Sequence, residues 1–256
     1  MTIATSTLIN GISVMIVGFF AAIIGVWFLY RYLREKRKLL PFVSILGFCW
    51  VAQYLGVFID FWSLVVTGAN IGATFAIQIS YFITPISIMN AIWLGFSIFN
   101  PKWKKQAFYI YLATAVPWYI ALFGWPELMY VSNANVSVLN ASGLLLTTNL
   151  SSVLLYLAIV YIFSAIFVIA GGFFSLRKKV TGFERQRATD LGVGHVLFGI
   201  AAILETTTGS FGDPVLIIAR IMMAIYLVLI YLGFSAKSAA KGNHPPVGLA
   251  TEEINN

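Results

Sequence analysis

Residues 8–38 read LINGISVMIVGFFAAIIGVWFLYRYLREKRK, an almost wholly apolar stretch that ends in a cluster of arginine and lysine. A membrane-spanning helix needs about 20 apolar residues in succession, and residues 8–30 supply that length. Cations collect at the cytoplasmic ends of such helices because basic loops are translocated poorly during insertion. This pairing of an apolar run with a basic cluster recurs along the chain and predicts its fold class.

Seven apolar segments predict an all-α integral membrane protein, a bundle of seven transmembrane helices. Charged residues make up 10% of the chain, whereas a soluble domain averages about 25%. Short connections between the segments predict that successive helices pack as antiparallel neighbours. The expected helices cover residues 8–30, 42–66, 71–99, 107–123, 149–175, 189–209 and 214–235.

The basic residues predict the orientation of the bundle. Of the 16 lysines and arginines, all except Arg220 fall in alternate loops or in the C-terminal tail. Because positive loops stay in the cytoplasm, we expect the N-terminus outside and the C-terminus inside. The net charge of +7 then reflects topology and an affinity for anionic membrane lipids, and nucleic acid is not an expected partner. The basic clusters are Arg31 to Lys38, Lys102 to Lys105, Arg177 to Arg187, and Lys237 with Lys241.

The chain is expected to form one transmembrane domain, residues 1–235, and a disordered cytoplasmic tail, residues 236–256. The tail is too short for a folded output domain. No small-residue cleavage site follows residues 8–30, so this segment is expected to remain as the first helix of a multi-pass protein of the cell membrane.

The longest outer loop is expected between Gly124 and Thr148. It carries Asn-x-Ser triplets that begin at Asn135 and Asn140. Because the charge pattern places this loop outside, both asparagines are candidate glycosylation sites, although such triplets are also common by chance in loops rich in Asn and Ser.

Ionisable side chains inside a bilayer are costly and often functional. Depth along the expected helices places four polar residues in one outer layer: Asp60, Gln78, Glu205 and Arg220. A buried arginine keeps its charge and needs an acceptor. Asp60 matches Arg220 best in depth, at about 9 Å below the outer surface for each, and Glu205 is the second choice. The layer is interpreted either as a structural ion pair or as a ligand or coupling site.

A second, inner polar set comprises Gln53, Asn90 and His195. A lone intramembrane histidine is more often a hydrogen-bonded packing residue than a ligand. With one helical histidine, a bis-histidine haem site and a three-histidine zinc site are excluded, so no metal or cofactor is expected.

Aromatic residues supply 16% of the chain. Trp103, Trp118 and Trp125 are expected near the membrane interfaces, where tryptophan gathers. Prolines at 85 and 117 fall inside the third and fourth expected helices and should kink them. Aromatic residues within the helices that are candidates to line a pocket are Tyr81, Phe82, Trp93, Tyr226 and Tyr231.

Residues Ser80 to Pro85, SYFITP, are similar to a stretch in the third helix of microbial rhodopsins, which also have seven helices and an outside N-terminus. That likeness implies a retinal pigment, but the seventh helix contains no lysine to form the Schiff base. A covalently bound retinal is therefore excluded. The layout also resembles the seven-helix input modules of prokaryotic sensor proteins, in architecture only.

These observations favour a non-enzymatic sensor or receptor-like module, or an accessory subunit of a membrane complex. We expect a protein partner or a homo-oligomer, with the basic loops as docking surfaces. The alternative is a secondary transporter or ion-coupled carrier that uses Asp60, Glu205 and Arg220. No nucleophile–base pair or metal cluster is evident, so no catalytic residue is predicted.

Overall fold

The computed structural model of the chain describes residues 5–125, 158–211 and 213–235. Seven helices in these ranges are long and apolar enough to cross a membrane, and the described residues contain no strand. The prediction of an all-α bundle with seven spans is thereby confirmed. The triplets at Asn135 and Asn140 and the tail at 236–256 lie outside the described residues.

The spans differ in continuity. The first, fourth, sixth and seventh are α1 (Thr5–Glu35), α6 (Lys104–Gly124), α9 (Gly182–Phe211) and α10 (Asp213–Ser235). The second is divided into α2 (Leu40–Gln53) and α3 (Leu55–Thr67), and the third into α4 (Ala73–Phe82) and α5 (Thr84–Phe99). The described part of the fifth begins as a π-helical segment (Ala158–Phe163) and continues as α8 (Ser164–Arg177).

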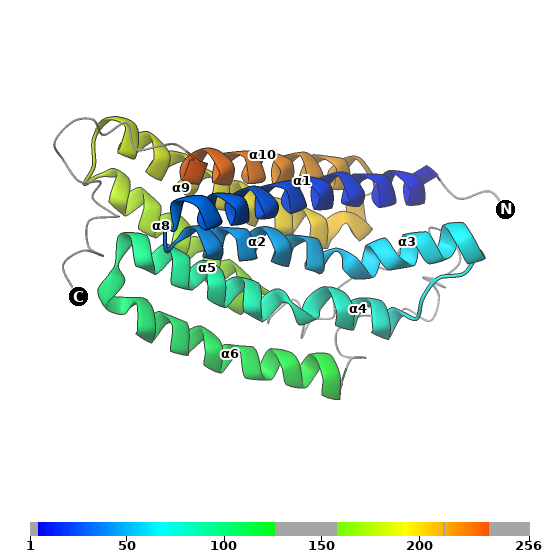
Figure 1. Cartoon of the computed structure of the whole chain (residues 1–256). Helices are drawn as coiled ribbons and strands as arrows, with labels where there is room; N and C mark the ends of the chain where they lie inside the picture. Colours follow the sequence, from blue (N-terminus) through cyan, green and yellow to red (C-terminus); the bar gives the residue numbers. More distant parts are fainter. Residues whose placement is uncertain (1–4, 126–157, 212, 236–256) are drawn as a thin grey trace.

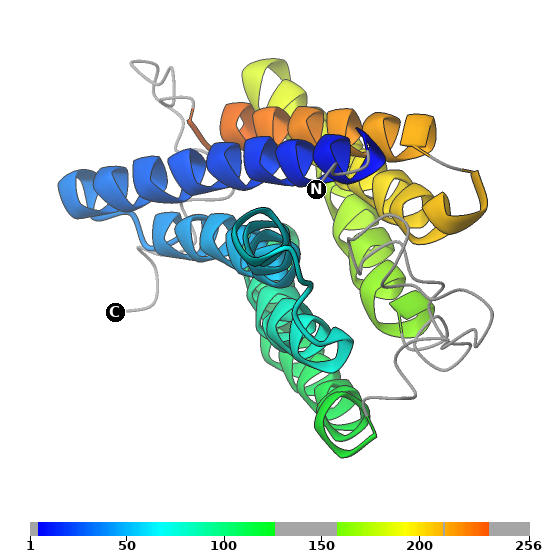
Figure 2. The same ribbon diagram turned by 90° about the vertical axis from the view of Figure 1, so that its right-hand side faces the viewer.

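Six helices close a ring around the core. Contacts run from α1 to α2, α2 to α5, α5 to α8, α8 to α9, α9 to α10 and from α10 back to α1. Helix α6 packs on α4 and α5, on the side of the bundle away from α1 and α10 (Figures 1 and 2). The space enclosed by the ring is therefore shared by helices that are far apart in the sequence.

The basic connections gather at one end of this bundle. The turns that follow α1, α5 and α8, and the last turn of α10, all lie at the left of Figure 1. These turns contain or adjoin the clusters at Arg31 to Lys38, Lys102 to Lys105 and Arg177 to Arg187. We call this the basic end of the bundle.

Glycines set the closest helix contacts. A Cβ atom on Gly47 would lie 2.8 Å from the Cα of Gly25, so α1 and α2 approach with backbone against backbone. The Ser44 hydroxyl donates a hydrogen bond of 2.7 Å to the Gly25 carbonyl at this crossing. On α3, a Cβ on Gly56 would overlap the Ala76 carbonyl and the Ser80 hydroxyl of α4. Gly56 thereby fixes how closely α3 and α4 approach.

Both divided spans break beside the core. The third breaks at Ile83, two residues before Pro85, which has no N–H to bond the Tyr81 carbonyl; the expected kink therefore takes the form of an interruption. The break of the second span at Tyr54 follows no proline; the Tyr54 N–H bonds to the Val51 carbonyl at 3.1 Å, the tighter spacing of a 3₁₀ turn. Pro117 lies within α6, which stays a single helix.

Trp118 is not exposed on the outside of the bundle as Trp103 and Trp125 are. Its side chain is 1% exposed, and its indole N–H donates a hydrogen bond of 3.2 Å to the Tyr81 carbonyl. Trp103 and Trp125 are 60% and 54% exposed. Trp118 is buried because it joins α6 to the third span, a contact that position along a helix cannot reveal.

Candidate functional site

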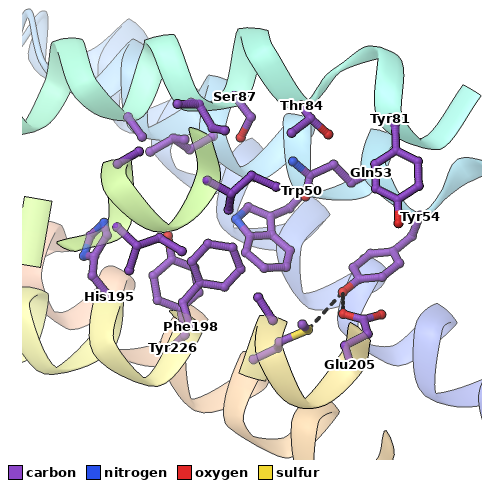
Figure 3. A pocket seen from close by; sticks show the side chains of 18 of the residues that line it. Trp50, Gln53, Tyr54, Tyr81, Thr84, Ser87, His195, Phe198, Glu205 and Tyr226 are labelled. Atoms are coloured by element: carbon purple, nitrogen blue, oxygen red, sulfur yellow. Dashed lines mark hydrogen bonds between the residues drawn. The ribbon is translucent and has the colours of Figure 1, made fainter. Parts of the chain in front are cut away.

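The ring surrounds a partly open cavity of about 170 Å³, which extends along the bundle (Figure 3). Tyr54, Tyr81 and Glu205 border one end, and His195 lies at the other. His195 and Glu205 are ten residues apart on α9, which at 1.5 Å per residue corresponds to about 15 Å of helix. The lining comes from the second, third, fifth, sixth and seventh spans. This arrangement is typical of ligand sites built between the helices of a bundle.

Aromatic rings form one wall of the cavity. The ring of Trp50 on α2 lies 4.7 Å from that of Phe198 on α9, edge to face, and 5.6 Å from that of Tyr226 on α10. Phe198 and Tyr226 stack at 5.1 Å. Contacts of this kind add about 0.5–1.5 kcal/mol per pair beyond the area they bury, so they hold three spans in a fixed arrangement around the cavity.

A buried ion pair stands at the end of the cavity opposite His195. Nη2 of Arg220 lies 2.6 Å from Oε1 of Glu205. The Glu205 side chain contributes to the lining, and the Arg220 side chain is only 4% exposed. The pair joins α9 to α10 and neutralises the carboxylate that faces the cavity.

Tyr54 completes this charged end. Its hydroxyl has one proton to donate, and two acceptors lie within reach: the Met223 sulfur at 2.9 Å and Oε2 of Glu205 at 3.4 Å (Figure 3). The Arg220 guanidinium lies 4.5 Å from the centre of the Tyr54 ring, within the range of a cation–π contact. The break of the second span therefore turns Tyr54 toward the pair, and three spans meet there.

Arg220 has more donors than the pair uses. A guanidinium carries five N–H groups, and its buried Nε has no hydrogen-bond partner among the described residues. Among the described residues, Nη1 lies 4.0 Å from the Met223 sulfur, the outer limit of a hydrogen bond to sulfur. An unpaired donor in a buried position costs about 1–3 kcal/mol, so this end of the cavity is not at its most stable arrangement.

A second wall is polar but uncharged. It consists of Ser80 on α4, Thr84 and Ser87 on α5, and Gln53 on α2. The Ser80 hydroxyl is buried without a partner. The side chains of the other three form no hydrogen bond to any described residue.

His195 has a defined tautomer. Its Nδ1 lies 2.7 Å from the Leu191 carbonyl, which can only accept, so Nδ1 carries the proton. In the neutral ring Nε2 is then an acceptor. The rings of Phe173 and Tyr226 pack on the imidazole at 5.7 and 5.6 Å. His195 is thus held rigidly at its end of the cavity.

The structure brings only part of the predicted outer layer together. Arg220 pairs with Glu205, the second choice of the depth argument, and the choice of Asp60 as its first partner is wrong. Asp60 instead accepts hydrogen bonds from the Asn70 amide at 2.9 Å and the Ile71 N–H at 2.8 Å, which closes the α3–α4 connection. Gln78 donates to the Leu122 carbonyl at 3.2 Å and ties α4 to α6.

The inner set is also divided. Gln53 and His195 both line the cavity. Asn90 donates a hydrogen bond of 2.7 Å to the Phe42 carbonyl and joins α5 to α2. Within the described ranges, no three His, Cys, Asp or Glu side chains lie close enough to hold a metal ion.

Sequence reasoning named Gln53 of the polar wall but missed its three hydroxyls, and it also missed Tyr54 and Trp50. A signal for the wall was present, since Ser80, Thr84 and Ser87 follow the four-then-three spacing of one helix face. Of the five aromatic pocket candidates, Tyr81 and Tyr226 line the cavity. The other three pack elsewhere: Phe82 against Tyr119, Trp93 against Phe108 and Tyr231 against Phe28.

The chain matches no protein-family model, no curated protein and no solved structure. What the cavity can do chemically therefore follows from its own side chains. It offers a narrow aromatic and aliphatic space, a row of neutral hydrogen-bonding groups, and a neutralised carboxylate at one end. These are the means to bind and orient a small molecule.

Proposed function

We propose that this protein is a receptor-like module of the cell membrane that binds a small molecule in the cavity and passes a helix shift to a partner protein. The observation that carries the proposal is the cavity itself, which lies between five spans and presents polar groups that no other described side chain uses. Buried polar groups are normally hydrogen-bonded. A cavity that leaves several of them open is better explained by a ligand than by packing.

In this proposal the N-terminus faces outward and the basic end faces the cytoplasm. The gathering of three basic connections at one end of the bundle supports that orientation. The cavity end with Tyr54 and Glu205 then lies toward the outer surface, and His195 lies deeper. The exposed cations at the basic end form the surface for anionic lipids or a partner subunit.

Helices α9 and α10 provide the path from the cavity to the basic end. Glu205 and Phe198 of α9 and Tyr226 of α10 all face the ligand space. At the basic end, Nε of Arg187 on α9 donates to the Gly233 carbonyl at 2.8 Å, and Nη1 of Arg31 on α1 donates to the Ser235 carbonyl at 2.8 Å. A ligand that moves α9 against α10 would therefore strain these contacts and alter the surface around them.

The carrier alternative draws on the same ion pair but has less support. Coupled transport of an ion needs a sequence of polar groups across the bilayer. Toward the basic end, Asn90 is engaged with the Phe42 carbonyl and His195 with the Leu191 carbonyl. Asp60, which the carrier hypothesis assigned to the coupling site, belongs to the α3–α4 connection.

The test is to purify the protein from its own membranes in mild detergent and measure its mass in the native state. A receptor-like module should arrive with a bound small molecule or with a stoichiometric partner chain. The variant Ala202→Phe should lose the small molecule, because Ala202 lines the cavity between Phe198 and Glu205. The matched control is Ala113→Phe, which adds the same ring at an exposed position of α6.

The proposal would be overturned if the parent protein arrives without a bound molecule and without a partner chain. Its native mass would then differ from that of Ala202→Phe only by the mass of the substitution. Accumulation of a labelled solute in vesicles that contain the protein would favour the carrier instead.

A further inference from the structure

We infer that the cavity takes an uncharged amphiphile: a narrow, mainly apolar molecule with one or two neutral hydrogen-bonding groups such as a hydroxyl. This inference rests on the proposed function and narrows its ligand to one chemical class. Three observations carry it, namely the open polar wall, the absence of net charge, and the apolar remainder of the lining.

The polar wall is a continuous row. Ser80, Thr84 and Ser87 lie four and three residues apart, so their side chains share one face across the α4–α5 break. Gln53 approaches from α2 and lies next to Thr84 in Figure 3. The primary amide offers two donors and an acceptor oxygen, and each hydroxyl offers one donor and acceptor sites. A ligand hydroxyl that both donates and accepts fits this row.

The cavity carries no net charge. Glu205 is the one carboxylate among the described residues that line the cavity, and Arg220 neutralises it at 2.6 Å. A ligand carboxylate would lie in a weakly polar space beside Glu205 without a counter-ion. A ligand ammonium would meet a carboxylate whose charge Arg220 already balances. Either charge would lose its hydration without an adequate replacement.

Beside the aromatic wall, much of the remaining lining is aliphatic. The π-helical segment and α8 contribute Ile162, Ala165, Ile166 and Ile169, and Leu46 and Ile88 add to the same surface. These side chains offer no hydrogen bond, so they favour a hydrocarbon portion. A cavity of about 170 Å³ is comparable with an apolar cavity of about 150 Å³ that takes up one benzene molecule. The ligand, or its buried part, is therefore slender and small.

The experiment compares four probes that share one chain: n-octanol, n-octane, octanoate and octylammonium. The full-length protein is placed in lipid nanodiscs, and its melting temperature is followed as each probe is added. Concentrations are expressed as mole fractions in the bilayer, so that differences in partitioning cancel. A ligand that binds the folded state raises the melting temperature, and the rise grows with the logarithm of the ratio of ligand concentration to Kd once that ratio is well above one.

We expect n-octanol to bind about three- to tenfold more tightly than n-octane. This ratio of dissociation constants corresponds to the net contribution of one neutral hydrogen bond. The two charged probes should bind more weakly than n-octane. The double variant Gln53→Leu with Thr84→Val keeps size and removes two of the four polar groups, so the preference for n-octanol should fall. Thr114→Val is the matched control, because Thr114 is an exposed residue of α6 that bonds its own helix.

The outcomes separate the two proposals. If octanoate, octylammonium or n-octane binds as tightly as n-octanol, the ligand class is wrong while the cavity remains a binding site. If none of the four stabilises the protein, and Ala202→Phe melts as the parent does with each probe, the cavity holds water only and both proposals fail. If the double variant does not fold, Ser87→Ala alone must still reduce the preference for n-octanol, and an unchanged preference overturns the inference.

Discussion

Glu205 and Arg220 form one ion pair but have unequal access to the cavity. Their oxygen and nitrogen lie 2.6 Å apart, and the side chains are 20% and 4% exposed. The carboxylate thus faces the ligand space, while the guanidinium stands behind it with donors to spare. Among the described residues, the pair meets the cavity through Glu205.

Removal of Arg220 should be severe. The variant Arg220→Met leaves Glu205 buried without its counter-charge, and breaking a buried pair in this way costs about 3–5 kcal/mol of unfolding free energy. Adding Glu205→Met should recover most of that loss, because no charge then remains. Thermal unfolding in mild detergent measures both variants. Equal stability of Arg220→Met and the parent would mean that the guanidinium does not support the fold.

Asp60 should act independently of Arg220. Asp60→Ala removes the acceptor of the Asn70 and Ile71 hydrogen bonds, which is expected to cost about 1–3 kcal/mol. Because Asp60 bonds the α3–α4 connection and Arg220 pairs with Glu205, the double variant with Arg220→Met should be additive within about 0.5 kcal/mol. The corresponding double-mutant cycle of Glu205 and Arg220 should give a much larger coupling energy. If the coupling energy between Asp60 and Arg220 is as large as that between Glu205 and Arg220, Asp60 also belongs to the ion-pair site.

The number and approximate limits of the spans followed from sequence because the bilayer imposes them. Lipid requires about 20 apolar residues for each helix, and this requirement holds whatever the neighbouring helices are. The start of helix α9 was not predicted by this requirement. It begins at Gly182, seven residues before the expected start at 189, because Glu184 and Arg187 extend it beyond the apolar run.

The partners of the polar residues did not follow, because sequence gives depth but not direction. Asp60 and Arg220 match in depth, but the α3–α4 packing set by Gly56 and the Asp60–Ile71 hydrogen bond hold Asp60 elsewhere. The break at Tyr54 has no local sequence signal, since its stabilising contacts are with Glu205, Met223 and Arg220 on two distant helices. Rotation about the helix axis is decided by such tertiary contacts.

Gly56 should be intolerant of any side chain. In Gly56→Ala the new Cβ would overlap the Ala76 carbonyl, and the backbone must move to admit it. Such overpacking typically costs about 1–3 kcal/mol. Gly18→Ala is the control, because nothing lies within 4 Å of a Cβ at that position of α1. The melting temperature should fall for Gly56→Ala and hold or rise for Gly18→Ala, and equal changes would contradict the α3–α4 packing.

Arg187 should hold the end of α10 closed. The last four carbonyls of a helix lack intrahelical donors, and Arg187 supplies one to Gly233 while it also pairs with Glu184 at 3.1 Å. Loss of a cap of about 1 kcal/mol predicts roughly fivefold faster amide exchange over the last turn of α10 in Arg187→Met. Hydrogen exchange read by mass spectrometry on the peptide that ends at Ser235 measures this change.

The control for the α10 cap is Arg185→Met. Arg185 is an exposed neighbour whose side chain contacts no described partner, so its loss removes the same charge from the basic end without touching α10. If both variants speed exchange equally, the effect is one of charge and not of the Gly233 contact. If only Arg187→Met does so, a ligand in the cavity that shifts α9 against α10 should change exchange in the same peptide, because Arg187 belongs to α9 and Gly233 to α10.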